Sequence, residues 1–317
     1  MLSVAQIGLN TADLPGSLQF YSDAFGFANA GAQTLWGQWA RVQGTDDTAR
    51  SIIWWLVGRQ KRFQLELFYH TRPKQRPLRA DWKPNDLGWV RFGVAVADFD
   101  RALEAFKWHD VPLAGDIIKV DGLRRAAVRD PFVGAMLEVM EDGPAFKPRQ
   151  GAPAGKGPAF VYATSSVSDL DGARSFYRDD LGAEIVPLEG LHVPAHEALW
   201  GLPGAAREGF LARFGDVHLE ILRYTNPKGR PKPADYRFSD QGITNVAFGP
   251  RRRADSQAVL DRLMAKGLKT PYLVDAGDLL AFYIIDPERE IELATVTEDL
   301  EEPLGFVPKA PFFGAKD

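Results

Sequence analysis

Apolar and polar positions follow one order that recurs four times along the chain. Each unit begins with a short apolar run typical of a β-strand, continues with a helical pattern, and ends with runs of alternating polarity that predict about three more strands. The predicted leading strands are Val4–Leu9, Val90–Val96, Phe160–Ser166 and Thr244–Phe248, and the helices are Leu18–Phe25, Arg101–Trp108, Gly172–Leu181 and Ala254–Lys266. The helices are short, so we expect units to pair and curl their strands into a cup.

The two halves of the chain also match each other. Equivalent residues recur at an offset of 154 to 156 positions, which is hard to obtain by chance. The clearest pairs are Asp13 with Asp169, Tyr21 with Tyr177, Glu66 with Glu220, and Glu138 with Glu292. We therefore predict a tandem duplication. The expected domains are 1–150, with modules at about 1–75 and 85–145, and 158–300, with modules at about 158–226 and 240–298; a Gly- and Pro-rich linker joins them and 301–317 form a tail.

Composition removes several classes of function. The 317 residues contain no cysteine, which excludes disulfides, thiolate metal sites and cysteine nucleophiles. The net charge of −4 argues against a nucleic-acid partner. No apolar run approaches the roughly 20 residues that span a bilayer, and the first residues do not resemble a signal peptide. We expect a cytoplasmic protein with no membrane partner, and a homodimer stays open.

Recurring motifs resemble a known superfamily. The motifs that recur among the modules are a first strand ending in Asp, a helix reading Phe-Tyr-x-x-x-Leu-Gly, and an Asp-Pro turn before a strand with Glu. Over Met1–Glu298 this pattern is similar to the vicinal oxygen chelate superfamily, which holds glyoxalase I, bleomycin-resistance proteins and extradiol dioxygenases. The resemblance implies an α+β fold of four βαβββ modules paired into two open barrels, with a site inside a barrel.

The resemblance also indicates where ligands would lie. It points to a first-strand residue seven positions before the Asp and to the Glu of the last strand. In this chain the first-strand positions are Gln6, Arg91, Tyr162 and Asn245, and the last-strand positions are Glu66, Glu138, Glu220 and Glu292. All four carboxylates are present and no first-strand position is histidine. Neutral Tyr and Asn are poor ligands for Fe(II), so the pattern favours the fold over dioxygenase chemistry.

For the predicted N-terminal barrel we expect an ion pair. Arg91 would project between Glu66 and Glu138, and a guanidinium satisfies two carboxylates well. Gln6 would fill the remaining hydrogen-bonding need. A cation site is the competing interpretation.

The predicted C-terminal barrel is the expected active cavity. Glu220 and Glu292 would face one space as catalytic groups, and His218 would share a strand face with Glu220. Asn245 and Tyr162 would orient a substrate oxygen. Tyr283 resembles a tyrosine that extradiol dioxygenases place beside the substrate, although its spacing to Glu292 looks one residue short.

A loop at 190–204, rich in Gly and Pro, is expected to cover that cavity as a mobile lid, with Trp200 against the ligand. His192 and His196 are four apart, but Pro194 between them makes a helical metal grip improbable. Trp36, Trp39, Trp54 and Trp55 cluster in one segment, as packing residues or as an aromatic ligand wall. His70 and His109 are expected at the surface.

Three functions compete. The first is an enzyme that uses Glu220, Glu292 and His218 for acid/base chemistry on a small apolar or aromatic molecule with one or two oxygens. The second is a ring-cleaving dioxygenase or lyase in which the same three residues hold Fe, Mn or Zn. The third is a ligand-sequestering protein of the bleomycin-resistance type.

Overall fold

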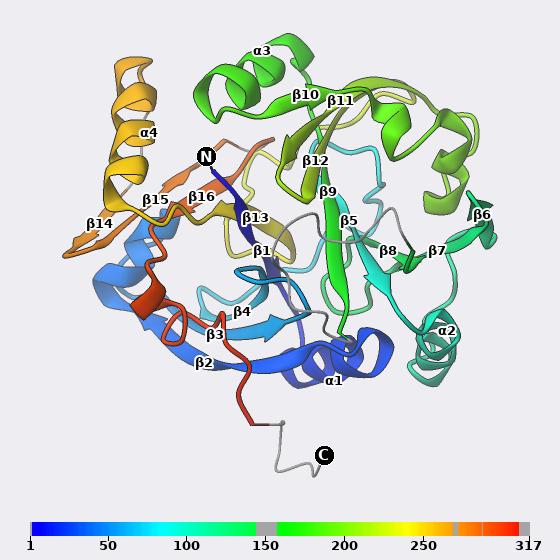
Figure 1. The fold of residues 1–317 in the computed structure, drawn as a ribbon, viewed down its shortest axis with the longest axis horizontal. Coiled ribbons are helices and arrows are strands. Elements are labelled where there is room, and N and C mark those ends of the chain that lie inside the picture. The colour runs from blue at the N-terminus through cyan, green and yellow to red at the C-terminus, as the bar shows by residue number, and fades with distance from the viewer. Residues whose placement is uncertain (1, 144–156, 269–271, 287, 311–317) are drawn as a thin grey trace.

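Four βαβββ modules build the protein, as predicted (Figure 1). The computed structural model describes residues 2–143, 157–268, 272–286 and 288–310. The first module holds β1 (Val4–Asn10), α1 (Leu14–Phe25), β2 (Ala28–Trp36), β3 (Arg50–Val57) and β4 (Gln64–Arg72). The second holds β5 (Gly88–Val96), α2 (Phe99–Trp108), β6 (Ile118–Val120), β7 (Leu123–Arg129) and β8 (Met136–Glu141).

The second half repeats this order. The third module holds β9 (Ala159–Ser166), α3 (Leu170–Ser175), which runs into a π-helical turn (Phe176–Asp180), β10 (Glu184–Val186), β11 (Ala206–Phe214) and β12 (Val217–Asn226). The fourth holds β13 (Gly242–Phe248), α4 (Arg253–Ala265), β14 (Leu273–Ala276), β15 (Leu279–Ile284) and β16 (Ile291–Ala294). Short 3₁₀ helices lie at Gly37–Gln43, Leu188–Gly190, Pro194–Trp200 and Glu298–Leu300. The predicted linker falls largely outside the described residues.

The modules pair across the two halves of the chain. One eight-stranded sheet, here called sheet A, has the order β14-β15-β16-β13-β1-β4-β3-β2, so it joins modules four and one. The other, sheet B, has the order β10-β11-β12-β9-β5-β8-β7-β6 and joins modules three and two. The prediction of one barrel from 1–150 and another from 158–300 is therefore wrong.

The reason lies in the leading strands. Each one is the edge of its own module's sheet, and an unpaired edge must find a partner. β1 pairs antiparallel with β13, and β5 pairs antiparallel with β9. All four edges carry the same apolar pattern, so the sequence does not reveal which two will meet.

The connecting segments 73–87 and 227–241 contact each other reciprocally. Arg76 pairs with Asp235 and Asp240, and Arg230 pairs with Asp81 and Asp86. These partners are related by the 154-residue offset of the sequence repeat. The two connecting segments thus form equivalent ion pairs between the halves of the chain, as expected from a sequence duplication.

Strand alternation gives each sheet two faces. Ile7, Leu9 and Leu65 point to a continuous apolar core that also holds the inner faces of the helices. Gln6 and Glu66 point to the opposite, inner face of sheet A. The polar positions singled out in the sequence therefore lie inside the curl of a sheet, away from the helices.

The recurring Asp has a structural role. Asp13, Asp98 and Asp169 each cap a helix by accepting a hydrogen bond from the backbone N–H three residues further on, at 3.1, 2.9 and 2.9 Å. The fourth helix, α4, has Arg252 at its N-cap position, and no side chain caps it. The motif is thus a helix-start signal, and its loss in the fourth module leaves the strand order unchanged.

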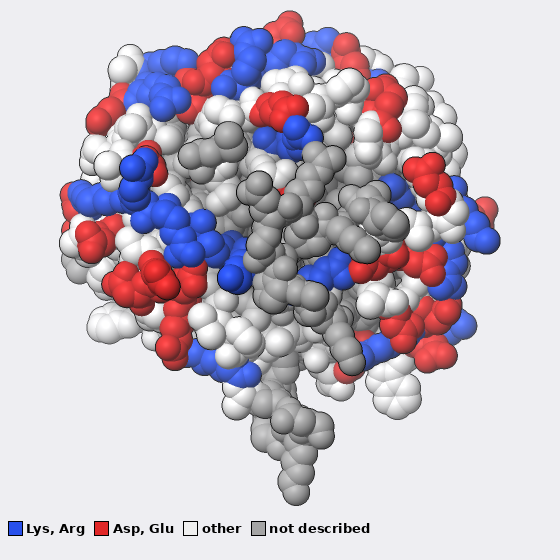
Figure 2. All heavy atoms as spheres, viewed as in Figure 1, with Lys and Arg blue, Asp and Glu red and all other residues white. Residues whose placement is uncertain are grey.

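Charged groups are interspersed on the outside. Figure 2 shows Lys and Arg mingled with Asp and Glu on the face in view, with no broad area of one sign. In the part of the chain that the structure describes, no helix has the length and apolarity needed to cross a bilayer.

The exchanged pairing predicts that residues 1–150 do not fold alone. In that fragment β1 and β5 would both lose the partner strands β13 and β9. We expect the isolated half to lack a cooperative thermal transition by circular dichroism, and co-expression with 158–317 to restore one. A cooperative, monomeric half would contradict the exchanged topology.

Candidate functional site

Four polar side chains from the central strands meet inside sheet A. Gln6 on β1 donates from Nε2 to Glu66 on β4 and, at 3.1 Å, to Glu292 Oε2 on β16. Asn245 on β13 donates from Nδ2 to the same Glu292 oxygen at 3.3 Å. The two carboxylates are therefore linked through one amide group.

Register brings these residues together. β1 lies between β4 and β13, with Gly8 opposite Glu66 on one side and Asn245 on the other. A Cβ on Gly8 would lie 2.3 Å from Asn245 Oδ1, so only glycine allows this approach. Tyr283 pairs with Glu292 across β15 and β16. The close packing of the central strands thus fixes the spacing of the acidic groups.

Two further donors complete the cluster. The Trp55 indole donates from Nε1 to Glu66 Oε1 at 3.0 Å, and the Tyr283 hydroxyl donates to Glu292 Oε2 at 2.8 Å. Gln64 donates from Nε2 to Gln6 Oε1 at 2.8 Å, which orients the Gln6 amide. Each carboxylate therefore accepts hydrogen bonds from neutral groups.

The surroundings favour a proton on this pair. Burial raises the pKa of Glu66 well above its usual range, and the nearby carboxylate of Glu292 raises it further, while the Trp55 hydrogen bond acts in the opposite direction. Burial raises the pKa of Glu292 to about 7, against the lowering effect of the hydrogen bonds it accepts. The environment thus favours the protonated form of Glu66, and Glu292 lies close to its midpoint of ionisation near neutral pH.

A cavity of about 140 Å³ leads to this pair. Glu66 is buried and Glu292 is half-buried. The wall is mainly apolar, with contributions from Leu35, Trp39, Val42, Ile53, Trp55, Phe68, Tyr283, Leu304 and Phe306. Several wall residues also line an outer hollow of about 650 Å³, namely Gln33, Leu35, Trp39, Leu279 and Leu304. Among the described lining residues of the cavity none is Lys or Arg.

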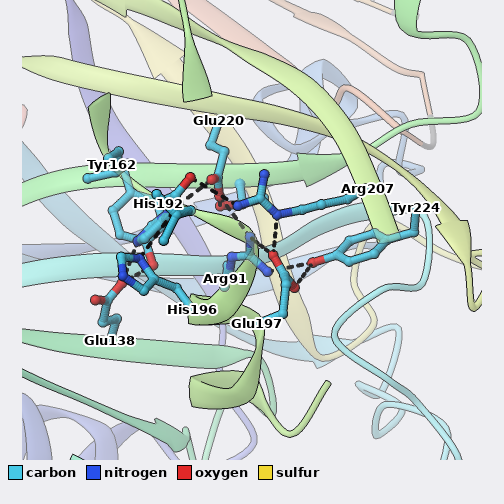
Figure 3. Close-up of polar contacts among 12 residues, drawn as sticks. Arg91, Glu138, Tyr162, His192, His196, Glu197, Arg207, Glu220 and Tyr224 are labelled. Atoms are coloured by element: carbon cyan, nitrogen blue, oxygen red, sulfur yellow. Dashed lines mark hydrogen bonds and ion pairs between the residues drawn. The ribbon is translucent and has the colours of Figure 1, made fainter. Parts of the chain in front are cut away.

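The equivalent positions in sheet B form a different centre (Figure 3). Arg91 on β5 donates from Nη2 to Glu220 Oε2 at 2.8 Å and from Nη1 to the Tyr224 hydroxyl at 2.7 Å. Its guanidinium lies 3.8 Å from the Trp200 ring centroid. Arg91, Glu220 and Trp200 are fully buried. This centre is closed by the protein's own side chains.

A histidine bridges the two carboxylates of sheet B. The His192 ring nitrogens lie 3.0 Å from Glu138 Oε2 and 2.9 Å from Glu220 Oε1. Burial opposes a charge on His192, but the two carboxylates raise its pKa above the usual value. Burial likewise opposes charge on Glu220, and Arg91 and His192 nevertheless hold its pKa well below the usual range. The sheet B carboxylates are thus ionised and neutralised by cations, unlike those of sheet A.

Similarity to solved structures over nearly the whole chain decides the fold. Glyoxalase I from Zea mays superposes with a TM-score of 0.59 at 16% identity, covering 96% of this chain and 96% of that chain. A proposed dioxygenase from Bacillus subtilis gives a TM-score of 0.57 at 16% identity, covering 96% and 86%. This chain has the vicinal oxygen chelate fold. No protein-family model and no curated protein matches the sequence.

The vicinal oxygen chelate fold confirms the resemblance, but the predicted grouping of site residues is wrong. Glu220 and Glu292 were expected in one cavity and lie in different sheets. Arg91 was expected to pair with Glu66 or Glu138 and instead pairs with Glu220. Because modules one and four share a sheet, Gln6 and Glu66 join Asn245 and Glu292. The remaining first- and last-strand residues meet in sheet B.

The other predicted residues follow from this regrouping. Tyr162 bonds to Glu138 inside the closed centre instead of facing a ligand cavity. Tyr283 and Asn245 both donate a hydrogen bond to Glu292, and Tyr283 also lines the cavity. His218 is half-buried on β12 opposite Tyr162, while the imidazole that bridges Glu138 and Glu220 belongs to His192.

The 190–204 loop is a plug, not a mobile lid. Its helical turn Pro194–Trp200 packs Trp200 against Arg91, and Glu197 inside it binds Arg207 and the Tyr224 hydroxyl. A Pro- and Gly-rich composition is typical of mobile loops, yet the large apolar side chains Leu191, Leu199, Trp200 and Leu202 are buried against sheet B. Sequence composition does not separate these two outcomes.

Two further expectations are corrected or refined. His70 was expected at the surface and is buried, with contacts to Ser51 at 2.7 Å and to Asn10 at 3.0 Å. His109 is half-buried beside Asp23. In the tryptophan cluster, Trp39 and Trp55 line the cavity, so part of it is an aromatic wall. Leu304 and Phe306 were missed, because a tail after the last module carries no repeat signal.

Another hollow, of about 390 Å³, lies between the two connecting segments. Its four basic residues are all paired: Arg76, Arg79 and Arg230 each with two aspartates, and Lys232 with Glu290. Ion pairs, some within one half of the chain and some between the halves, therefore account for its basic groups. The sheet A cavity is the better candidate, because it alone of these two reaches carboxylates with a raised pKa.

The sheet A residues do not fit a transition-metal site as they lie. Iron and zinc favour imidazole, and this group offers two carboxylates and two amides. The Gln6 amide nitrogen, a hydrogen-bond donor, lies between the carboxylates where a cation would need an acceptor. Within the described ranges, no three His, Cys, Asp or Glu side chains gather in a way that could hold a metal ion. We therefore derive no metal-dependent step.

This donor set predicts weak metal binding. Mn²⁺ or Zn²⁺ added to the purified protein should fall well below one equivalent after dialysis, measured by elemental analysis. Retention of one equivalent that Glu66→Gln and Glu292→Gln both abolish would contradict this.

The closed centre of sheet B predicts a large loss of stability in Arg91→Ala. The substitution leaves Glu220 buried without its guanidinium, and broken buried pairs cost about 3–5 kcal/mol. Denaturant unfolding would measure the change. Arg223→Ala removes the exposed pair with Glu208 and should cost less than about 1 kcal/mol. Equal effects of the two substitutions would show that the buried pair does not stabilise the fold.

Proposed function

We propose that the protein is an enzyme that moves a proton on a small neutral molecule inside the sheet A cavity. The substrate class is apolar or aromatic with one or two oxygens. The observation that carries this proposal is the pair Glu66 and Glu292 at the end of an apolar cavity, both with a raised pKa and Glu292 near its midpoint of ionisation at neutral pH.

Each carboxyl group has a distinct role in the proposal. Glu292, half-buried and able to ionise near pH 7, is the base that takes a proton from carbon next to a carbonyl. Glu66 keeps its proton and donates a hydrogen bond to the substrate oxygen as negative charge builds there. The proton then returns from Glu292 to another atom of the substrate. Tyr283 and Asn245 hold the Glu292 carboxylate in place.

The cavity chemistry supports a neutral substrate. Its ionisable lining groups are acidic, and an anion would enter without a counter-charge among the described residues. Apolar and aromatic side chains supply most of the wall, which suits a hydrophobic body with a polar end.

The structural neighbours support a general function of this kind. One is named a glyoxalase and the other a proposed dioxygenase. The pair of raised pKa values favours acid/base chemistry over plain ligand sequestration, for which an apolar pocket alone would serve. The ligand set of a ring-cleaving dioxygenase is less supported, because His218 and Glu220 are not in this cavity.

Glu292→Gln should remove proton transfer. In D₂O the wild-type protein is expected to exchange the α-protons of small neutral ketones, from cyclohexanone to 2-tetralone, with a rate that rises through about pH 7 as Glu292 ionises. Loss of the base should lower the rate by about 10²–10⁴-fold. Proton NMR would follow the exchange.

The control is Glu208→Gln, which changes an exposed carboxylate on β11. Exchange unaffected by Glu292→Gln would refute the assigned base. Ketone binding without any exchange would favour the sequestering role instead.

A further inference from the structure

The chain continues beyond the last module and returns to the sheet A cavity. After the turn Glu298–Leu300, Glu301 pairs with Arg251 and lies 3.8 Å from Arg62. Further on, the Lys309 backbone N–H donates to the Asn29 carbonyl on β2 at 2.7 Å. The red segment in Figure 1 runs from the β16 side of the molecule past β3 and β2. Residues 301–310 are thus held at both ends across the cavity.

Between these anchors the segment touches the site. Leu304 and Phe306 line the cavity. Gly305 between them is buried, with φ +77°, and a Cβ at this position would lie 2.3 Å from the Trp55 ring. The segment therefore packs its backbone flat on the indole, which no side chain at 305 would allow.

Trp55 carries this contact to the acid pair. Its indole nitrogen donates to Glu66 Oε1 at 3.0 Å, so the ring orientation fixes one of the hydrogen bonds that Glu66 accepts. The Gly305 backbone covers one face of the Trp55 ring, and the indole N–H of Trp55 donates to Glu66. A small displacement of the ring would therefore break this hydrogen bond while Trp55 stays in β3.

We propose that the C-terminal segment 301–310 is a specificity wall of the cavity, in which Leu304 and Phe306 limit substrate length and Gly305 positions Trp55 on Glu66. This inference rests on the proposed function, which assigns the sheet A cavity as the substrate site. Gly305 acts through Trp55 and is a positioning residue. Leu304 and Phe306 contact the space that a substrate would fill.

A purely structural role explains the segment less well. Leu304 and Phe306 stay half-buried, and Pro303, Val307 and Pro308 are exposed. The apolar clusters that hold the sheets together draw on the four modules. Side chains that face a cavity and add little to the core are suited to selecting what enters it.

The first test reads Trp55 in the ligand-free protein. Gly305→Ala should shift the Trp55 indole N–H resonance and speed its exchange with water by at least about 10-fold, as the hydrogen bond to Glu66 opens. The matched control is Gly215→Ala in the β11–β12 turn, which also has positive φ (+66°) but meets nothing within 4 Å. An unmoved Trp55 resonance in Gly305→Ala, with the same stability loss as the control, would overturn the positioning role.

The second test measures selectivity with phenol, 4-ethylphenol and 4-butylphenol by calorimetry. Phe306→Ala should move the preference toward 4-butylphenol by about 10-fold, the discrimination that a misfit in an apolar pocket produces. Val307→Ala, on the exposed side, should not. An unchanged order of affinities would overturn the specificity role.

The two proposals can fail separately. Phenol binding with altered selectivity but no ketone exchange would refute the enzymatic function and keep the wall. Ketone exchange that is indifferent to Gly305→Ala and Phe306→Ala would keep the enzyme and refute the wall. If neither phenols nor ketones bind, the proposed substrate class is wrong, and the Trp55 resonance still decides the role of Gly305.

Discussion

The antiparallel pairing of leading strands, β1 with β13 and β5 with β9, is the constraint on which the rest of the structure depends. This pairing gives the edge strand of each module a hydrogen-bonded partner from the other half of the chain. The same pairing decides which polar residues share an interior. Had β1 met β5, Arg91 would have faced Glu66, and the acid pair of sheet A would have been neutralised.

Equivalent positions have opposite electrostatic outcomes in the two sheets. In sheet B, Arg91 and His192 lie against carboxylates that are fully buried, so charge is retained and compensated. In sheet A the neighbours of Glu66 and Glu292 are amides, an indole and a phenol, which donate hydrogen bonds but carry no charge. Burial then raises the carboxyl pKa values, and protons become available for transfer.

The sequence predicts the four modules well, but it does not predict which modules share a sheet. Periodicity and the repeat offset of 154 to 156 residues locate every βαβββ unit, and a capping Asp marks the helix start in three of them. The first- and last-strand positions of Gln6 and Glu292 do lie at the inner faces. Partnership depends on long-range edge pairing, for which four similar strands give no preference. The plug at Pro194–Trp200 and the wall at Leu304 were not predictable, because burial of a loop depends on a space that only the assembled sheets create.

The polar centres inside the two sheets affect stability in opposite ways. A buried acid pair without a neighbouring cation destabilises the fold once it ionises, because Glu292 loses its proton less readily in the native state than in the unfolded chain. Its contribution to stability is greatest below the ordinary pKa of a glutamate and is lost as the pH rises through about 7. The compensated centre of sheet B has the reverse behaviour for Glu220, whose lowered pKa stabilises the fold above the ordinary value. One continuous apolar core joins both sheets, so the folded chain carries both centres together.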